Sequence, residues 1–290
     1  MRAPAALLLV LLPLAQPLLA AVPSAELESV RALLRERKVA EAETAARQLV
    51  ARHAQAAEAH AQLGAVLMNK QDADAAVKAF EQAAKLAPND SEIHRRLGDA
   101  YGFGAQKAGM MSKFGLAKKC LAAYEKAVAL DPRNLAARQS LLGYYQAAPG
   151  MVGGGMDKAY AQAEEIKRLD ADRGRLAFAQ LYAAEKKWGE AFAEFEEVLK
   201  RDPTNYLALF QIGRLAALSG ERVDRGLDTL RQALTLPPSA GAAGHEAAHW
   251  RLGMLLEKKG DKAGAKSAYE AALKVNPQFA QAIEALKKLG

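Results

Sequence analysis

Two distant segments of the chain repeat the same spacing of apolar and polar residues. In residues 57–90 and 246–279, small or apolar side chains fall at positions 7, 8 and 11 of each segment, and again at positions 20, 24 and 27. Intervals of three and four place each set on one face of a helix. A proline at position 32 follows the second set and would end its helix. The pattern therefore predicts two helices in each segment.

The same register continues through nearly all of the chain after its first residues. It defines repeat units at about 23–56, 57–90, 91–134, 135–171, 172–205, 206–239 and 246–279, and an amphipathic segment follows at 280–290. A single unit cannot bury its apolar face alone, whereas stacked units share a continuous core. We therefore predict an all-α solenoid over residues 23–290, with the last segment as its cap.

The residues at the recurring positions resemble the tetratricopeptide repeat (TPR). The matched pairs are His60 and His249, Leu63 and Leu252, Gly64 and Gly253, Leu67 and Leu256, Ala76 and Ala265, Phe80 and Tyr269, Ala83 and Ala272, and Pro88 and Pro277. The resemblance implies a TPR-type α-solenoid of about seven helix-turn-helix repeats plus a C-terminal capping helix. It also implies a concave groove that binds peptides or protein segments.

Residues 1–22 follow a different pattern. Arg2 precedes an apolar stretch that reaches about residue 19, and small residues follow it as a cleavage site. This is the order of a secretory signal peptide. The alternative is an uncleaved membrane anchor, although Pro13 and Pro17 disfavour a spanning helix. No cysteine follows the stretch, which disfavours a lipoprotein. The leader therefore predicts an exported, periplasmic protein.

Composition and charge narrow the function classes. Hydrophobic residues make up 51% of the chain but aromatic residues only 6%, which fits helices packed through alanine rather than a sheet with a bulky core. A single cysteine excludes an intramolecular disulfide framework. The net charge of +7 would suit an anionic partner, but an exported protein is not expected to meet DNA or cytosolic RNA.

One motif invites an enzymatic interpretation. His245, Glu246 and His249 fit HExxH, in which two histidines bind zinc and the glutamate acts as a general base. His249 nevertheless falls at repeat position 4, where His60 and His94 also stand, so the repeat explains it without a metal. We therefore predict no catalytic residue, no metal and no cofactor, and keep a zinc-dependent hydrolase as the alternative.

Two units carry insertions at the turn between their helices. Residues 102–119 contain lysines and apolar side chains but no acidic residue, and residues 148–158 are rich in glycine. The first insertion either packs locally or forms a platform for an anionic or apolar partner, such as an anionic envelope surface. Its candidate residues are Lys107, Met110, Met111, Lys113, Phe114 and Lys118.

The groove implied by the resemblance provides the second candidate site. Residues at first-helix positions that commonly face inward in the family are Arg95, Asp99, Phe103, Gln139, Gln180, Phe210, Arg214, Trp250 and Met254. Arginine and aromatic side chains are frequent anchors of protein interfaces. The paired lysine and asparagine of the family's carboxylate clamp do not appear. The sequence therefore predicts a non-enzymatic scaffold or adaptor that binds a peptide or protein partner.

Overall fold

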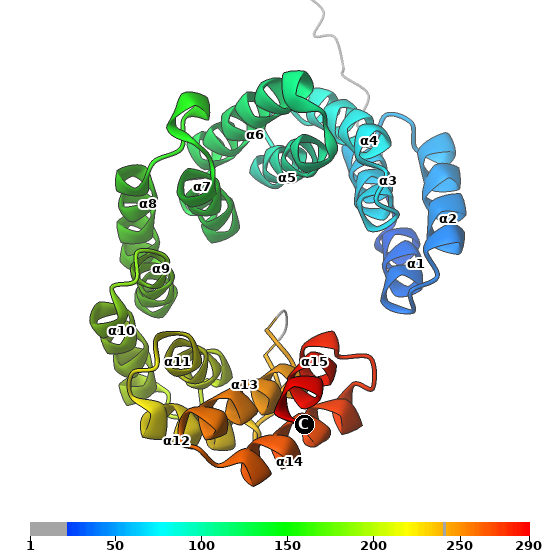
Figure 1. Ribbon diagram of the computed structural model, residues 1–290. Helices are drawn as coiled ribbons and strands as arrows, with labels where there is room; N and C mark the ends of the chain where they lie inside the picture. Colours follow the sequence, from blue (N-terminus) through cyan, green and yellow to red (C-terminus); the bar gives the residue numbers. More distant parts are fainter. Residues whose placement is uncertain (1–21, 240–241) are drawn as a thin grey trace, which may run out of the picture. The chain divides into compact units, whose positions relative to one another are not determined.

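The computed structural model describes residues 22–239 and 242–290, so the predicted leader, apart from Val22, lies outside the described residues. The chain divides into two compact units, and the division falls after Leu116, inside a helix. The first unit contains α1 (Ser24–Arg35), α2 (Val39–Arg52), α3 (Ala57–Asn69), α4 (Ala73–Leu86), α5 (Ser91–Lys107) and the start of α6 (Met110–Leu130) (Figure 1).

The second unit contains the rest of α6 and all later elements. These are α7 (Leu135–Ala147), a short 3-10 helix η1 (Gly150–Val152), α8 (Met156–Leu169), α9 (Ala171–Ala184), α10 (Trp188–Arg201), α11 (Tyr206–Ser219), α12 (Val223–Ala233), α13 (His245–Lys258), α14 (Lys262–Val275) and α15 (Ala280–Leu289). None of the described helices is both long enough and apolar enough to cross a bilayer.

The predicted all-α fold of helix pairs is confirmed. The described residues form 15 α-helices and no strand, in a TPR-like helical repeat array. Within residues 57–90, α3 packs on α4, and within residues 246–279, α13 packs on α14. The last helix, α15, packs on α14, where the capping segment was predicted. The limits of the individual repeat units remain predictions.

Short polar side chains start many of these helices. A side-chain oxygen at the N-cap accepts a hydrogen bond from a backbone N–H in the first turn, which satisfies a donor that the helix leaves unpaired. Asp72, Asp90, Asn134, Asp170, Asn205 and Asp261 cap α4, α5, α7, α9, α11 and α14 in this way. These caps help to fix where each helix begins along the chain.

Glycines at repeat position 8 bring the paired helices close together. A Cβ atom added to Gly64 on α3 would lie 2.6 Å from the ring of Phe80 on α4. Gly253 on α13 has the same relation to Tyr269 on α14. The aromatic ring at position 24 therefore occupies the space that glycine leaves open, which explains why the two residues recur together.

The first insertion extends two helices rather than forming a long loop. Helix α5 continues to Lys107, and α6 begins at Met110, so Ala108 and Gly109 make the whole turn. The second insertion contains η1 and two glycines with positive φ angles, Gly153 at 92° and Gly155 at 158°. Its backbone is tied to the second unit, because the Tyr144 hydroxyl donates to the carbonyl of Val152 at 2.8 Å.

Candidate partner-binding surface

The predicted groove residues of the first unit lie together on α5. Arg95 donates to Glu92 at 2.7 Å and to Asp99 at 2.6 Å. The hydrogen bond from Arg95 lowers the pKa of Glu92 to about 2, and the bond from Arg96 contributes in the same direction. The charge of Arg95 is thus already balanced within its own helix, which leaves it little excess charge for a partner.

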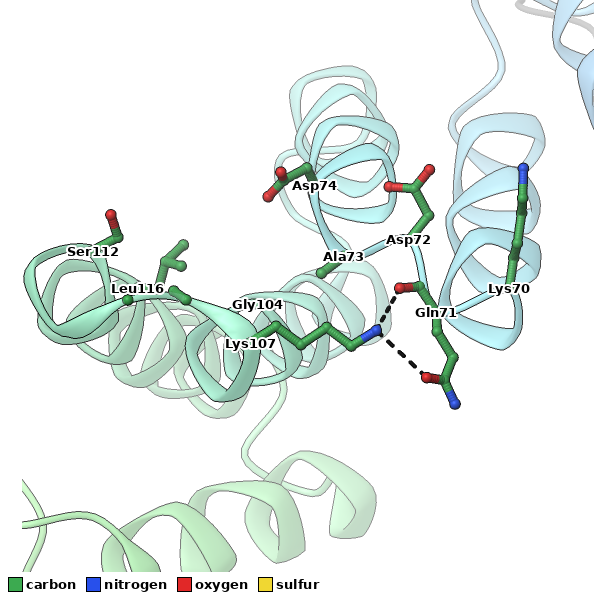
Figure 2. Close-up of a pocket in the computed structure, with 11 residues that line it drawn as sticks. Lys70, Gln71, Asp72, Ala73, Asp74, Gly104, Lys107, Ser112 and Leu116 are labelled. Carbon is green, nitrogen blue, oxygen red and sulfur yellow. Dashed lines mark hydrogen bonds between the residues drawn. The ribbon is translucent and has the colours of Figure 1, made fainter.

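Phe103, the third groove residue on α5, lies in the part of this helix that belongs to the first insertion. The Lys107 ammonium lies 4.5 Å from the centre of the Phe103 ring, and the Lys107 Nζ also donates to the backbone oxygen of Gln71 at 2.6 Å. Figure 2 shows this lysine reaching from α5 to the turn between α3 and α4. Lys107 therefore joins two repeats and closes one side of a pocket of about 640 Å³.

The other residues of the predicted platform are exposed on α6. Met110 is 72% exposed, Met111 is 94% exposed and Phe114 is 37% exposed. Lys113 and Lys118 are exposed as well. The first turns of α6 therefore present apolar side chains and lysines to solvent, whereas Lys107 is engaged with Gln71.

The predicted groove residues of the second unit lie on the first helices of successive pairs. Gln180 on α9 and Arg214 on α11 line one pocket of about 340 Å³. The same pocket is lined by Gln146 from α7, Trp188 from the start of α10, and Gln211, Leu218, Ala183 and Ala184. Gln139 is exposed on α7 but does not line this pocket. Three successive first helices therefore contribute an amide side chain to one surface.

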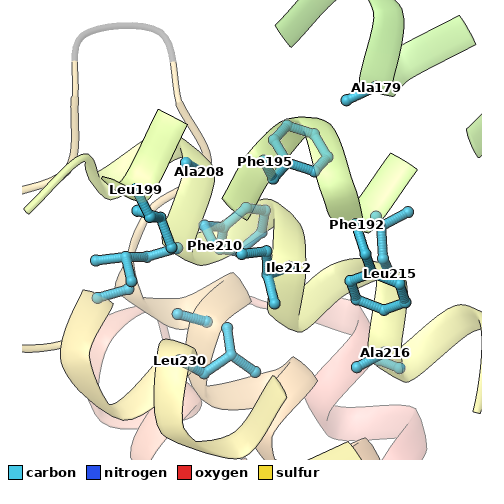
Figure 3. Packing of buried hydrophobic residues seen from close by; sticks show 14 of the residues in the cluster. Ala179, Phe192, Phe195, Leu199, Ala208, Phe210, Ile212, Leu215, Ala216 and Leu230 are labelled. Atoms are coloured by element: carbon cyan, nitrogen blue, oxygen red, sulfur yellow. The ribbon is translucent and has the colours of Figure 1, made fainter. Parts of the chain in front are cut away.

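Phe210 does not belong to that surface. It is only 5% exposed, and its ring stacks on Tyr206 with 6.3 Å between the centroids. Figure 3 shows it in the same buried cluster as Phe195 and Ile212. The cause is the burial of α11, which packs against α10, α12 and α13. Phe210 is a core residue, so it offers almost no surface to a partner.

Trp250 and Met254 on α13 line a second pocket, of about 850 Å³, which α14 and α15 complete. Its other walls include Tyr269, Gln281, Glu284 and Lys288. The Trp250 ring also meets Phe279 edge-on, with 6.0 Å between centroids. These two predicted residues thus share one surface with the capping helix, whereas Gln180 and Arg214 share another.

Arg251, which follows Trp250 on α13, is not among the groove residues predicted from the sequence. Its guanidinium lies 4.1 Å from the centre of the Trp250 ring, and its Nη1 lies 3.4 Å from the Met254 sulfur. Burial lowers its pKa to about 10, and the charge of Arg214 contributes to this shift. Position 6 of the repeat is not one of the inward positions that the resemblance supplies, so the pattern gave no signal for it.

A comparison with known protein families finds a match for the two segments that define the repeat. Residues 57–90 and 246–279 both fit the description of the tetratricopeptide repeat family. These two segments are TPR units within a TPR-like helical repeat array. The helix pairs α3–α4 and α13–α14 are the two matched TPR units, and their Gly–aromatic contacts are the packing of positions 8 and 24.

A curated relative matches part of this chain. The tetratricopeptide repeat and J domain-containing co-chaperone DNJ1 of Fusarium oxysporum is 35% identical over 109 residues. This match covers 38% of the chain but only 20% of the length of DNJ1. The similarity therefore concerns a part of each protein.

Solved structures share the fold at low sequence identity. A tetratricopeptide repeat protein from Parabacteroides merdae has a TM-score of 0.63 and 14% identity, and the match covers 91% of this chain and 97% of that one. Human IFIT1, solved as a dimer with m7Gppp-AAAA, has a TM-score of 0.61 and 17% identity, over 91% of this chain and 61% of its own. At these identities the similarity shows the fold alone.

His249 of the HExxH motif stands at position 4 of the repeat, where polar side chains of other units have a structural role. At position 4, the His60 ring donates to the carbonyl of Ala54 at 2.9 Å and the His94 ring to that of Pro88 at 3.0 Å. Arg138, at the same position, donates to the carbonyl of Pro132. A polar side chain at position 4 thus holds the loop before its own helix.

In the last TPR unit the loop is held by different groups. The His245 ring donates to the carbonyl of Leu236 at 2.8 Å, and the Tyr206 hydroxyl donates to that of Ala243 at 2.7 Å. His245 is the first residue of α13. Within the described residues, no group of three or more His, Cys, Asp or Glu side chains could hold a metal ion. The structure therefore gives His245 a role in the loop.

Proposed function

We propose that this protein is a non-enzymatic scaffold, and that it binds a segment of a partner protein on the first-helix surface of its second unit. The observation that carries the proposal is the pocket of about 340 Å³, to which α7, α9 and α11 each contribute a glutamine. Neither the Gln146 nor the Gln180 side chain forms a hydrogen bond with another described residue. An extended peptide offers backbone groups that such amides can bind.

The pocket also contains apolar surface beside its amides. The Trp188 indole and the exposed Leu218 side chain both line it. An indole next to hydrogen-bonding groups is typical of interface residues that dominate the energy of binding. A peptide with one apolar side chain and a free backbone would match both features of this pocket.

Site-specific crosslinking tests this assignment. A photoreactive amino acid at Gln180 should capture a protein partner from the native compartment, because position 180 lines the pocket. The same amino acid at Asp228 is the matched control, since this residue is exposed on the second helix α12 and lies outside the pocket. Equal capture at both positions, or capture at position 228 alone, would contradict the proposed surface.

We also propose that the mature protein acts outside the cytoplasm, in the periplasm. The support is the sequence of residues 1–22, with Arg2 before an apolar stretch and small residues after it. Cell fractionation combined with N-terminal sequencing of the isolated protein tests this. A cytoplasmic protein that retains Met1 or Arg2 would contradict export.

A second candidate function rests on the exposed start of α6. Met110 and Met111 are the two most exposed large apolar side chains at the start of α6. Lys113 and Lys118 are exposed on the same helix. Apolar side chains beside lysines suit an anionic membrane surface. Binding to vesicles with anionic lipid should weaken with salt and with the substitutions Lys113→Gln and Lys118→Gln. Binding that is insensitive to both would remove this candidate.

A further inference from the structure

Two arginines of the second unit lie on neighbouring first helices, and the charge of one affects the other. Arg214 lies on α11 and Arg251 on α13, and these two helices are in contact. Both side chains are half-buried. Burial lowers the pKa of each, and the charge of Arg214 further lowers the pKa of Arg251 to about 10. Both groups are nevertheless charged at neutral pH, so the fold holds two like charges near each other.

The local partners of these arginines are neutral. The Nε of Arg214 donates to the side-chain oxygen of Gln211. The guanidinium of Arg251 stacks on Trp250, and its Nη1 contacts the Met254 sulfur. Among the described residues, neither arginine forms an ion pair. Several of their N–H donors are therefore available to an external acceptor.

This arrangement differs from that of every other arginine that is partly or fully buried in the described chain. Each of those others has a carboxylate within ion-pair distance: Arg95 with Glu92, Arg96 with Glu92, Arg138 with Glu165, Arg175 with Glu194, and Arg225 with Glu196. Burying a cation without a counter-charge is unfavourable, because water no longer solvates it fully. A bound anion would supply the missing counter-charge.

We propose that Arg214 and Arg251 recognise an Asp or Glu side chain of the partner segment. This inference rests on the proposed function, because Arg214 lines the pocket in which that segment would bind. A guanidinium binds a carboxylate through two parallel hydrogen bonds, and a second guanidinium strengthens the attraction. Arg214 shares its pocket with the amides of Gln146 and Gln180 and with the Trp188 ring. The amides suit the backbone of a peptide and the ring suits an apolar side chain, so the pocket favours a peptide over an isolated anion.

A peptide selection tests the assignment. Purified protein is used to select binders from a random library of peptides of about ten residues, and the affinity of one selected peptide is then measured by fluorescence anisotropy. We expect the selected peptides to be enriched in Asp and Glu. Because each substitution removes charge-assisted hydrogen bonds to the carboxylate, Arg214→Gln and Arg251→Gln should each weaken binding about tenfold or more.

A control variant and a stability measurement separate recognition from folding. Arg231 is 60% exposed on α12 and lies 3.6 Å from Asp228. The Arg231→Gln variant should therefore bind the selected peptide with the affinity of the unmodified protein. The thermal midpoint of Arg251→Gln should be equal or higher, because the substitution removes a like-charge pair. A lower midpoint together with weaker binding would show a structural role instead and overturn the proposal.

The remaining outcomes distinguish this inference from the function on which it rests. Selected peptides without an excess of acidic residues would overturn the arginine assignment and leave the peptide-binding role in place. A protein that selects no peptide at all would overturn both. Stronger competition by a single-stranded RNA of about ten nucleotides than by the acidic peptide would show that the arginines serve a phosphate backbone, which also overturns the proposal.

Discussion

At the residue scale, the contact between a glycine and an aromatic ring explains much of the repeat. Gly64 on α3 is overlaid by the Phe80 ring, and Gly253 on α13 by the Tyr269 ring. Alanine is the better helix former by about 1 kcal/mol, so glycine persists here against its propensity. The ring needs the space that a Cβ atom would fill, and this steric requirement outweighs the propensity.

We therefore expect Gly64→Ala and Gly253→Ala to destabilise the protein by about 1–3 kcal/mol, because the ring has to move away from the added methyl group. Gly143→Ala on α7 is the matched control, since nothing lies within 4 Å of the position where its Cβ would be. That variant should be more stable by about 0.5–1 kcal/mol. Urea unfolding measures all three, and a destabilising effect of equal size at position 143 would contradict the steric explanation.

Glu92 gives a second prediction at this scale. Its folded pKa of about 2 lies below the ordinary value of 4.5, so its contribution is present above about pH 4.5 and is lost as pH falls towards 2. Its side chain is 42% exposed, so we reduce the expected contribution to about 1–2 kcal/mol. The free energy of unfolding should therefore fall less between pH 5 and pH 2.5 for Glu92→Gln than for the unmodified protein.

A matched control for this pH dependence is Glu164→Gln. Glu164 is exposed on α8 and has no ion pair among the described residues, so its substitution should leave the pH dependence unchanged. If both variants lose stability to the same extent as the unmodified protein between the two pH values, the Glu92–Arg95 contact contributes nothing to acid sensitivity.

At the element scale, α15 protects the end of the helix array. Ala282 is fully buried, and Leu286 and Leu289 pack on the cluster that contains Tyr269 and Ala272. A terminal helix of this kind shields the last apolar face of a repeat array from water. The same helix forms one wall of the pocket that contains Trp250 and Met254, so its loss would expose apolar surface on α13 and α14.

Leu286→Asp places a charge in this cluster and should release α15. We expect faster amide hydrogen exchange in α14 and α15, and stronger binding of an apolar dye, because Trp250 and Tyr269 become accessible. Lys287→Ala alters the neighbouring residue, whose side chain is 67% exposed, and should change neither measurement. Unchanged exchange in Leu286→Asp would mean that α15 does not protect α14.

The helices could be predicted from the sequence because each depends on local signals. The spacing of apolar positions, the Asp and Asn caps and the prolines after second helices all lie within or beside the element they define. The burial of Phe210 could not be predicted, since α11 is apolar on most of its faces and the spacing does not show which face remains exposed. The half-burial of Arg251 depends in the same way on a neighbouring helix.

At the scale of the whole molecule, two compact units divide inside α6. In a repeat array, each helix pair contacts mainly its neighbours, so stability is a sum of local terms. A substitution in one unit should therefore be felt first in the helices around it. This differs from a globular domain, in which all core residues contribute to one cooperative transition.

Hydrogen exchange measured on two reciprocal variants tests this expectation. Leu230→Ala removes a fully buried side chain from the hydrophobic cluster of the second unit and should lower the free energy of unfolding by about 2–5 kcal/mol. We expect the amides of α11, α12 and α13 to lose protection while those of α3 and α4 keep theirs. Phe80→Ala, at a side chain that is 2% exposed in the first unit, should produce the reverse pattern. If either variant lowered protection equally in both units, the two would unfold as one cooperative body, and the helix array would behave as a single globular domain.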